Sequence, residues 1–242
     1  MPVCSDCLDS IQPLTAVLCE WCGDKLVPRA EEGQICIHCE EKAPRFQHAA
    51  AYGEYEDALR GLIHLLKYQS VRPAARPLGK RLAQTIRPML MEFTGNEPVL
   101  LVPVPLHRQR RRTRGFNQAE KISRVALREL RDLPVRLAPS VLVRTRPTES
   151  QTGFTREQRR ENLRGAFKVP DPARVKGCNI LLVDDVLTTG ATADECSRIL
   201  LRAGAKQVLV ATVARAVSLD GVAAATKTCS AQEASARETV SV

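Results

Sequence analysis

The sequence predicts an α/β fold, in which a parallel sheet is flanked by helices and preceded by a small cysteine-rich module. From about residue 52 onward, apolar runs of strand length alternate with stretches of helical periodicity, the pattern of strands joined by crossover helices. Before that point, six of the nine cysteines form three Cys-x-x-Cys pairs within the first 39 residues. We therefore expect a module at 1–44, an α/β domain at 45–215, and a disordered tail at 216–242 that is poor in large apolar residues.

The elements of the α/β domain follow from two kinds of pattern. Apolar residues at helical spacing predict amphipathic helices, and continuous short apolar runs predict strands that are covered on both faces. The expected helices are 54–68, 78–93, 117–131 and 192–203. The expected strands are 99–104, 140–144, 179–183 and 207–213.

Positive charge is concentrated in one stretch. Residues 104–164 hold sixteen Arg or Lys against six Asp or Glu, an excess that accounts for the whole net charge of +9. This suits a polyphosphate ligand or a nucleic-acid backbone, and a solvated basic surface would have the same composition. Phe116 and Phe154 are either base-stacking candidates or core residues. Five arginines follow the strand at 99–104 and are expected in an exposed loop: Arg108, Arg110, Arg111, Arg112 and Arg114.

An apolar strand that runs into two acids and then into a Thr-Thr-Gly-Ala-Thr helix start predicts a phosphate site. Asp184 and Asp185 follow the strand directly, at the end where ligand crevices form in parallel sheets. The next helix presents unpaired N–H groups and a partial positive charge to an anion. Neither the Gly-x-x-x-x-Gly-Lys-Ser/Thr motif of nucleotide triphosphatases nor a Gly-x-Gly-x-x-Gly motif occurs. The structural alternative is a plain turn with a helix cap.

The cysteine spacing predicts a structural zinc site. Two residues between cysteines let both sulfurs reach one ion, and thirteen residues separate two such pairs. The expected ligands are Cys19, Cys22, Cys36 and Cys39. The spacing also allows the first two pairs, Cys4/Cys7 and Cys19/Cys22, to form the set. Between the ligands, His38 is expected to be an exposed loop residue. We expect Cys178 and Cys196 to be core thiols.

Three segments carry a resemblance to a known family. Residues 180–192 resemble the 5-phosphoribosyl-1-pyrophosphate (PRPP) motif of type I phosphoribosyltransferases. Within that superfamily, the chain up to about Arg215 resembles the ComF family, which joins a cysteine-rich zinc module to a phosphoribosyltransferase domain. The supporting segments are 102–106 with 114–118, and 151–167 with its Arg156, Arg159, Asn162 and Arg164.

The resemblance implies roles for particular residues. Asp184, Asp185 and Arg114 would be catalytic, with the two acids on the ribose hydroxyls. Residues 188–192 would hold the 5-phosphate, the turn at 103–106 the magnesium pyrophosphate, and a loop at 151–160 would close over the reaction centre. The residues implied in PRPP binding are Pro103, Val104, Pro105, Asp184, Asp185, Val186, Leu187, Thr188, Thr189, Gly190, Ala191 and Thr192. Many family members have four cysteine pairs, so Cys4 and Cys7 would lack a partner pair here.

The expected function is therefore PRPP and Mg²⁺ binding, with transfer of the phosphoribosyl group to an acceptor that the sequence does not identify. The alternative is a non-catalytic PRPP sensor or a single-stranded-DNA-binding adaptor. Some family members are linked to competence and DNA uptake, which implies partners in that machinery. No apolar run reaches the ~18 residues of a membrane span, and no secretory signal is recognised, so we expect a cytoplasmic protein.

Overall fold

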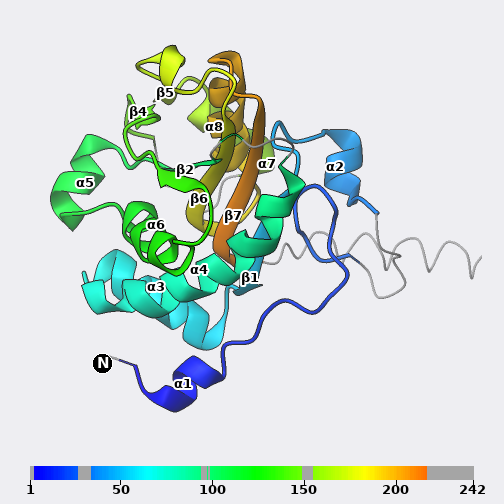
Figure 1. The fold of residues 1–242 in the computed structure, drawn as a ribbon. Helices are drawn as coiled ribbons and strands as arrows, with labels where there is room; N and C mark the ends of the chain where they lie inside the picture. The colour runs from blue at the N-terminus through cyan, green and yellow to red at the C-terminus, as the bar shows by residue number, and fades with distance from the viewer. Residues whose placement is uncertain (1–2, 27–33, 94–96, 98, 149–154, 217–242) are drawn as a thin grey trace, which may run out of the picture.

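A five-stranded parallel sheet is the centre of the molecule (Figure 1). The computed structural model describes residues 3–26, 34–93, 97, 99–148 and 155–216, and the expected tail therefore lies almost wholly outside the described residues. All described pairings in this sheet are parallel, as predicted. In spatial order its strands are β1 (Ala49–Glu54), β7 (Gln207–Arg215), β6 (Asn179–Leu187), β2 (Val99–Pro103) and β3 (Val135–Leu137).

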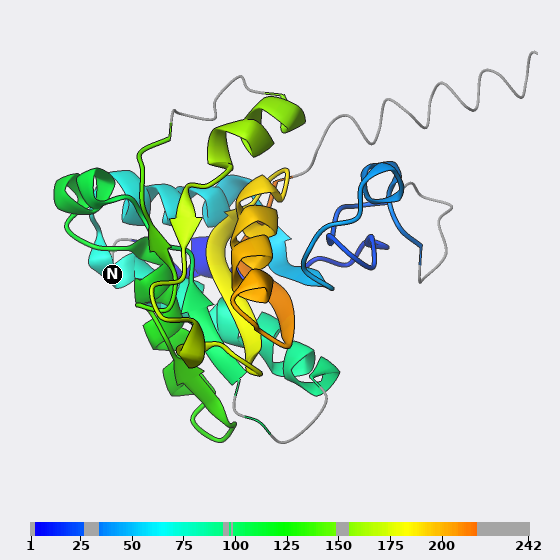
Figure 2. The same ribbon diagram turned by 90° about the horizontal axis from the view of Figure 1, so that it is seen from above.

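Helices cover both faces of the sheet (Figures 1 and 2). Leu181 and Val183 of β6 contribute to the core on one face, and Ile180 and Leu182 contribute to the core on the other. Both faces of β6 are therefore apolar, as expected of a central parallel strand. The first core is covered by α3 (Asp57–Tyr68), α4 (Ala75–Met89) and α6 (Gln118–Glu129), and the second by α8 (Ala191–Arg202).

Shorter elements surround this frame. The helices are α1 (Ser5–Asp9), α2 (Ile37–Glu41), α5 (Arg108–Arg114) and α7 (Arg156–Leu163), with 3₁₀ turns η1 (Arg72–Ala74), η2 (Leu90–Glu92) and η3 (Pro172–Arg174). A small antiparallel pair is formed by β4 (Val143–Arg144) and β5 (Phe167–Lys168). Within the described residues, no helix is long and apolar enough to cross a membrane.

The structure differs from the sequence prediction in several elements. Strand β1 was not expected, because its Ala-Ala-Ala-Tyr-Gly-Glu sequence has little strand propensity, and its pairing with β7 determines its conformation. Strand β3 has three residues and is too short to show a pattern. Of the expected strand at 140–144, only Val143 and Arg144 form a strand, and this strand, β4, lies outside the main sheet. The expected arginine loop is the helix α5, which ends at Gly115 in the left-handed conformation.

Two helical glycines provide a test of the packing. A Cβ on Gly79 of α4 would lie 2.4 Å from Cβ of Val125 in α6, whereas a Cβ on Gly61 of α3 would meet nothing within 4 Å. We expect Gly79→Ala to destabilise the fold by about 1–3 kcal/mol through overpacking. The control Gly61→Ala should stabilise it by about 0.5–1 kcal/mol through lower backbone entropy. Chemical denaturation measures both, and equal effects would contradict the close approach of α4 and α6.

Candidate functional site

A cleft of about 500 Å³ opens where β2 and β6 end. This is the carboxyl edge of the parallel sheet, where the ligands of such sheets bind. The acid pair, the start of α8 and the turn after β2 all contribute to it. Of the residues predicted for PRPP binding, seven line the cleft: Val104, Pro105, Asp184, Asp185, Val186, Thr188 and Thr192.

The remaining predicted residues lie behind this lining or beside it. Leu187 and Ala191 are buried in the core, and Pro103 pairs with Val183 inside the sheet. Thr189 and Gly190 belong to the same loop as the lining threonines without lining the cleft themselves. Of the expected closing loop, residues 151–154 lie outside the described residues, and Arg159 of α7 lines the cleft.

The two acids lie inside β6 and not after it. Strand β6 continues to Leu187 because β7 runs alongside it as far as Arg215. Asp184 is half-buried, and its Oδ1 accepts a hydrogen bond of 2.9 Å from the Asp185 backbone N–H. The side chain of Asp185 is only 4% exposed, and its Oδ1 lies 2.7 Å from Nζ of Lys67. Among the described residues, its buried Oδ2 has no hydrogen-bond partner.

The charges of this group depend on one another. Burial, and then the like charge of Asp185, raises the pKa of Asp184 to about 7. Burial alone would lower the pKa of Lys67, but the charges of Asp185 and Asp184 outweigh it and raise that pKa. Lys67 is therefore a partly buried ammonium ion that compensates two adjacent acids.

Residues 188–192 join β6 to the first turn of α8, and we call them the phosphate loop after the role that the sequence predicts for them. Gly190 takes the N-cap position of α8 with φ 76°, a left-handed conformation that favours glycine. Helix α8 starts directly after it, so the unpaired N–H groups of its first turn lie at the loop. The loop is tied to the strand beside it, because the Thr188 carbonyl accepts a hydrogen bond of 2.7 Å from Nη1 of Arg215.

Residues 114–118, one of the segments that carry the family resemblance, shape the turn after β2. Asn117 caps α6, and its Nδ2 donates to the carbonyl of Val104 at 2.9 Å, which holds the turn against the helix. Phe116 is buried in the core, so it is no stacking platform. Arg114 donates to Oε1 of Gln118 at 2.7 Å. Gln118 lines the cleft, whereas Arg114 lines the cavity next to it.

That neighbouring cavity, which we call the basic cavity, has a volume of about 630 Å³. It shares Lys67, Tyr68, Arg110, Arg144 and Thr148 with the cleft, so the two are continuous. Tyr68 is 67% exposed, and the Arg114 guanidinium lies 5.6 Å from the centre of its ring. The lining is Lys67, Tyr68, Ser70, His107, Gln109, Arg110, Thr113, Arg114, Arg144, Pro147 and Thr148.

Sequence reasoning missed five residues of the cleft: Tyr55, Lys67, Tyr68, Arg144 and Thr148. Lys67 looks like the polar edge of an amphipathic helix, and Arg144 like one more charge in a basic stretch. Only the fold brings them beside the acids from distant parts of the chain. Arg144 is largely withdrawn from water, which lowers its pKa, and its guanidinium lies 5.4 Å from the ring centre of Phe167.

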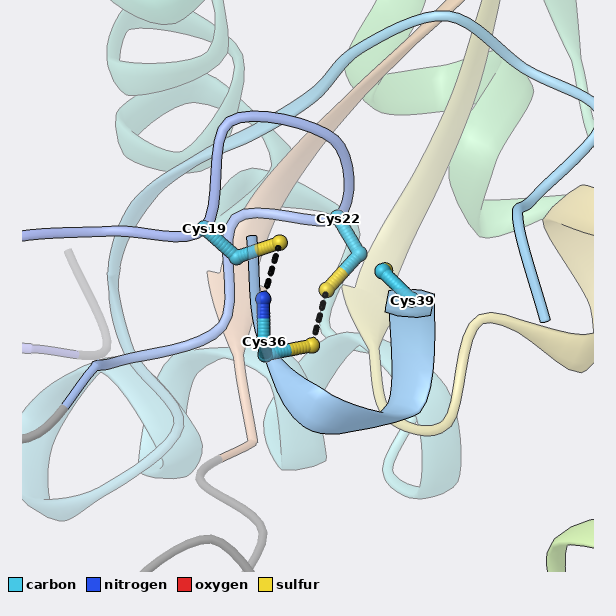
Figure 3. A group of neighbouring side chains, drawn as sticks. All are labelled: Cys19, Cys22, Cys36 and Cys39. Carbon is cyan, nitrogen blue, oxygen red and sulfur yellow. Dashed lines mark hydrogen bonds between the residues drawn. The ribbon is translucent and has the colours of Figure 1, made fainter. Parts of the chain in front are cut away.

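The four cysteines predicted as zinc ligands come together (Figure 3). Their sulfurs lie within 4.8 Å of one another, and the backbone N–H of Cys36 donates to Sγ of Cys19 at 3.2 Å. Sulfurs at about 2.3 Å from a tetrahedral zinc lie about 3.8 Å apart, so the set fits the ion. Hydrogen bonds from neighbouring thiols, that of Cys22 first, lower the pKa of Cys19, which favours the thiolate that zinc binds.

The other cysteines and His38 lie outside this centre. Cys4 and Cys7 are exposed at the start of α1, where Sγ of Cys4 accepts a hydrogen bond from the Cys7 N–H. His38 was expected in an exposed loop, but it lies in α2 and its Nε2 is buried. Cys196 is a core thiol as predicted, whereas Cys178 is only partly buried.

Comparison with known proteins agrees with this geometry. The phosphoribosyl transferase domain family matches residues 80–232. DNA utilization protein YhgH of Salmonella typhimurium is 32% identical over 86% of this chain and 88% of its own length. Competence protein F of Haemophilus influenzae is 32% identical over 88% and 90%, and competence protein ComFC of Bacillus subtilis is 24% identical over 84% and 79%.

The parallel sheet, the acid pair beside a phosphate loop and the domain match together place the chain in the type I phosphoribosyltransferase superfamily. Within that superfamily it belongs to the ComF family, as its similarity to the competence proteins over most of their length shows.

The cysteine geometry predicts about one zinc ion per chain. Cys39→Ser should lose the ion and unfold the module around it, because a module of this size depends on metal for folding energy. The double variant Cys4→Ser with Cys7→Ser should keep the ion, since neither side chain reaches the centre. Elemental analysis of the purified protein measures both. Two ions per chain, or loss of the ion from the double variant, would contradict the assignment.

Proposed function

We propose that the protein binds PRPP with Mg²⁺ in the cleft and transfers its phosphoribosyl group to an acceptor. The observation that carries this proposal is the pair of adjacent acids near the end of β6, just before the phosphate loop. Since relatives are called competence and DNA utilization proteins, we further propose that this activity serves DNA uptake in the cytoplasm.

The proposed binding follows the charges of the cleft. The ribose hydroxyls donate to Asp184 and Asp185, whose buried Oδ2 offers an acceptor site. The 5-phosphate accepts from the N–H groups and hydroxyls of the phosphate loop. The pyrophosphate lies at the turn after β2, near the cations Arg110 and Arg144. Mg²⁺ bound to the pyrophosphate would neutralise part of its charge.

The proposed reaction separates charge along the cleft. The bond from ribose C1 to the pyrophosphate oxygen breaks, and pyrophosphate leaves with the electron pair. The acceptor forms a new bond to C1 and gives up a proton. Positive charge on the ribose ring is stabilised by the acids, and negative charge on pyrophosphate by the arginines. Lys67 holds the Asp185 carboxylate in place before the substrate arrives.

The acid pair tests the proposal. The double variant Asp184→Asn with Asp185→Asn should abolish measurable PRPP binding in calorimetry with Mg²⁺. Loss of a preorganised charged contact of this kind also lowers the rate of the reaction by a factor of about 10² to 10³. The matched control is Asp171→Asn, because Asp171 caps η3 away from the cleft and asparagine caps equally well. Pyrophosphate release with bases, ammonia or single-stranded DNA would identify the acceptor. Unchanged PRPP affinity in the double variant would refute the site.

A second candidate function is single-stranded DNA binding in the basic cavity. The observation that favours it is the exposed ring of Tyr68 among Arg110, Arg114 and Arg144. A base can stack on such a ring while the arginines neutralise the neighbouring phosphates. Because this cavity is continuous with the cleft, a DNA strand there would be close to a bound PRPP.

For this second function, binding should weaken steeply as salt rises. Arg110→Ala should reduce the slope of log affinity against log salt by about 0.7, the value for one phosphate contact on a single strand. Tyr68→Ala should weaken binding by about 1–3 kcal/mol per stacked base, whereas Tyr68→Phe should not. The control is Arg136→Ala, which removes an equal charge from the edge strand β3, outside the lining of the basic cavity. A salt response that is equal in both arginine variants would exclude the basic cavity as the DNA site.

A further inference from the structure

A buried arginine connects the cysteine centre with the phosphate loop. Arg215 is the last residue of β7, and its side chain is only 2% exposed. Its guanidinium pairs in two directions, with Nη2 lying 3.0 Å from Oδ2 of Asp24 and Nη1 donating to the Thr188 carbonyl at 2.7 Å. A buried charge is costly without partners, so both contacts constrain where this side chain lies.

Asp24 belongs to the turn that carries two zinc ligands. It follows Cys22 by two residues, and its carbonyl accepts a hydrogen bond of 2.8 Å from the Cys19 N–H. Between them, Gly23 has φ 64°, and a Cβ there would lie 2.5 Å from the Ala49 carbonyl oxygen of β1. The turn at residues 19–24 therefore packs closely against β1. Because this turn holds Cys19 and Cys22, the arrangement of the cysteines determines the position of the Asp24 carboxylate.

The phosphate loop is held from the same side at further points. The ring of Phe46 lies 3.8 Å from where a Cβ of Gly190 would be. The backbone N–H of Arg45 donates to Oδ1 of Asp194, in the first turn of α8, at 2.7 Å. The Ala216 N–H donates to the Leu187 carbonyl at 2.9 Å, which fixes the end of β7 beside the start of the loop.

We infer that Arg215 and Asp24 are positioning residues through which the zinc centre holds the phosphate loop in its binding conformation. A filled centre fixes Asp24, Asp24 fixes the guanidinium of Arg215, and Arg215 fixes the Thr188 carbonyl and with it the loop. Arg215 does not line the cleft, so this effect acts through the loop and not by contact with substrate. The inference rests on the proposed function, because it takes residues 188–192 as the 5-phosphate site.

The link predicts a selective loss of affinity. Asp24→Asn removes the carboxylate charge at nearly equal volume and should weaken binding of ribose 5-phosphate and PRPP by about 5- to 150-fold, the usual range of coupling between sites. Binding of magnesium pyrophosphate, which does not use the phosphate loop, should stay unchanged, as should the zinc content. A fold that is merely destabilised would lose both ligands together.

A matched control lies in the neighbouring ion pair. Lys25 and Glu54 also join the cysteine turn to the sheet, but neither reaches the phosphate loop, so Glu54→Gln should leave both affinities unchanged. Where Asp24→Asn fails to fold, the double variant Asp24→Leu with Arg215→Met replaces the pair by apolar groups, which is often neutral for stability. This double variant should fold, and its affinity for ribose 5-phosphate should still be lower than that of the wild type.

Thermodynamic reciprocity gives a second measurement. If zinc favours PRPP binding, saturating PRPP must favour zinc binding by the same factor. In equilibrium competition with a chelator, PRPP should therefore raise the zinc affinity of the wild type but not that of Asp24→Asn. Wild type that binds no PRPP would refute the proposed function. The link would then be tested by hydrogen exchange of residues 188–192 after zinc removal, where unchanged protection would overturn it. Wild-type binding that Asp24→Asn leaves intact would overturn the link alone.

Discussion

The parallel pairing of β6 with β7 is the constraint on which the site depends. The two strands stay paired beyond the apolar core, as far as Leu187 and Arg215. This length carries Asp184 and Asp185 into the cleft as part of a rigid strand, and it ends where the phosphate loop must begin. The same pairing brings Arg215 beside Thr188. A shorter β7 would leave the acids on a flexible turn and the loop without its support.

The charge of the acid pair is partly compensated within the protein before any ligand binds. The carboxylates of Asp184 and Asp185 repel each other, because little water surrounds them. Lys67 offsets this repulsion from helix α3. Arg110 and Arg144 line the same cleft. The cleft thus holds acids and cations together, which suits a ligand with a neutral ring between two phosphate groups. The two arginines also line the basic cavity.

Local patterns in the sequence predicted the parts of the fold that local physics decides. Helices α3, α4, α6 and α8 follow from apolar periodicity, and β2, β6 and β7 from continuous apolar runs. The same patterns could not reveal β1, whose alanines form a strand only because β7 offers partners. Nor could they reveal Lys67 or the contact of Asp24 with Arg215, because these pairs join residues far apart in the chain. The acid pair and the cysteine set were recognisable because all their parts lie within short, regular spacings.

The N-terminal segment also covers an edge of the sheet. The backbone of β1 is joined on its outer side to two residues of this segment. The Leu14 N–H donates to the Tyr52 carbonyl, and the Trp21 carbonyl accepts from the Ala49 N–H. An open strand edge invites pairing with another copy of the chain and is a common origin of aggregation. The opposite edge, β3, is only three residues long and offers little to pair with. Shortened chains that begin after Pro44 would uncover the β1 edge, so the α/β domain of such a molecule would be prone to self-association even with its cleft unaltered.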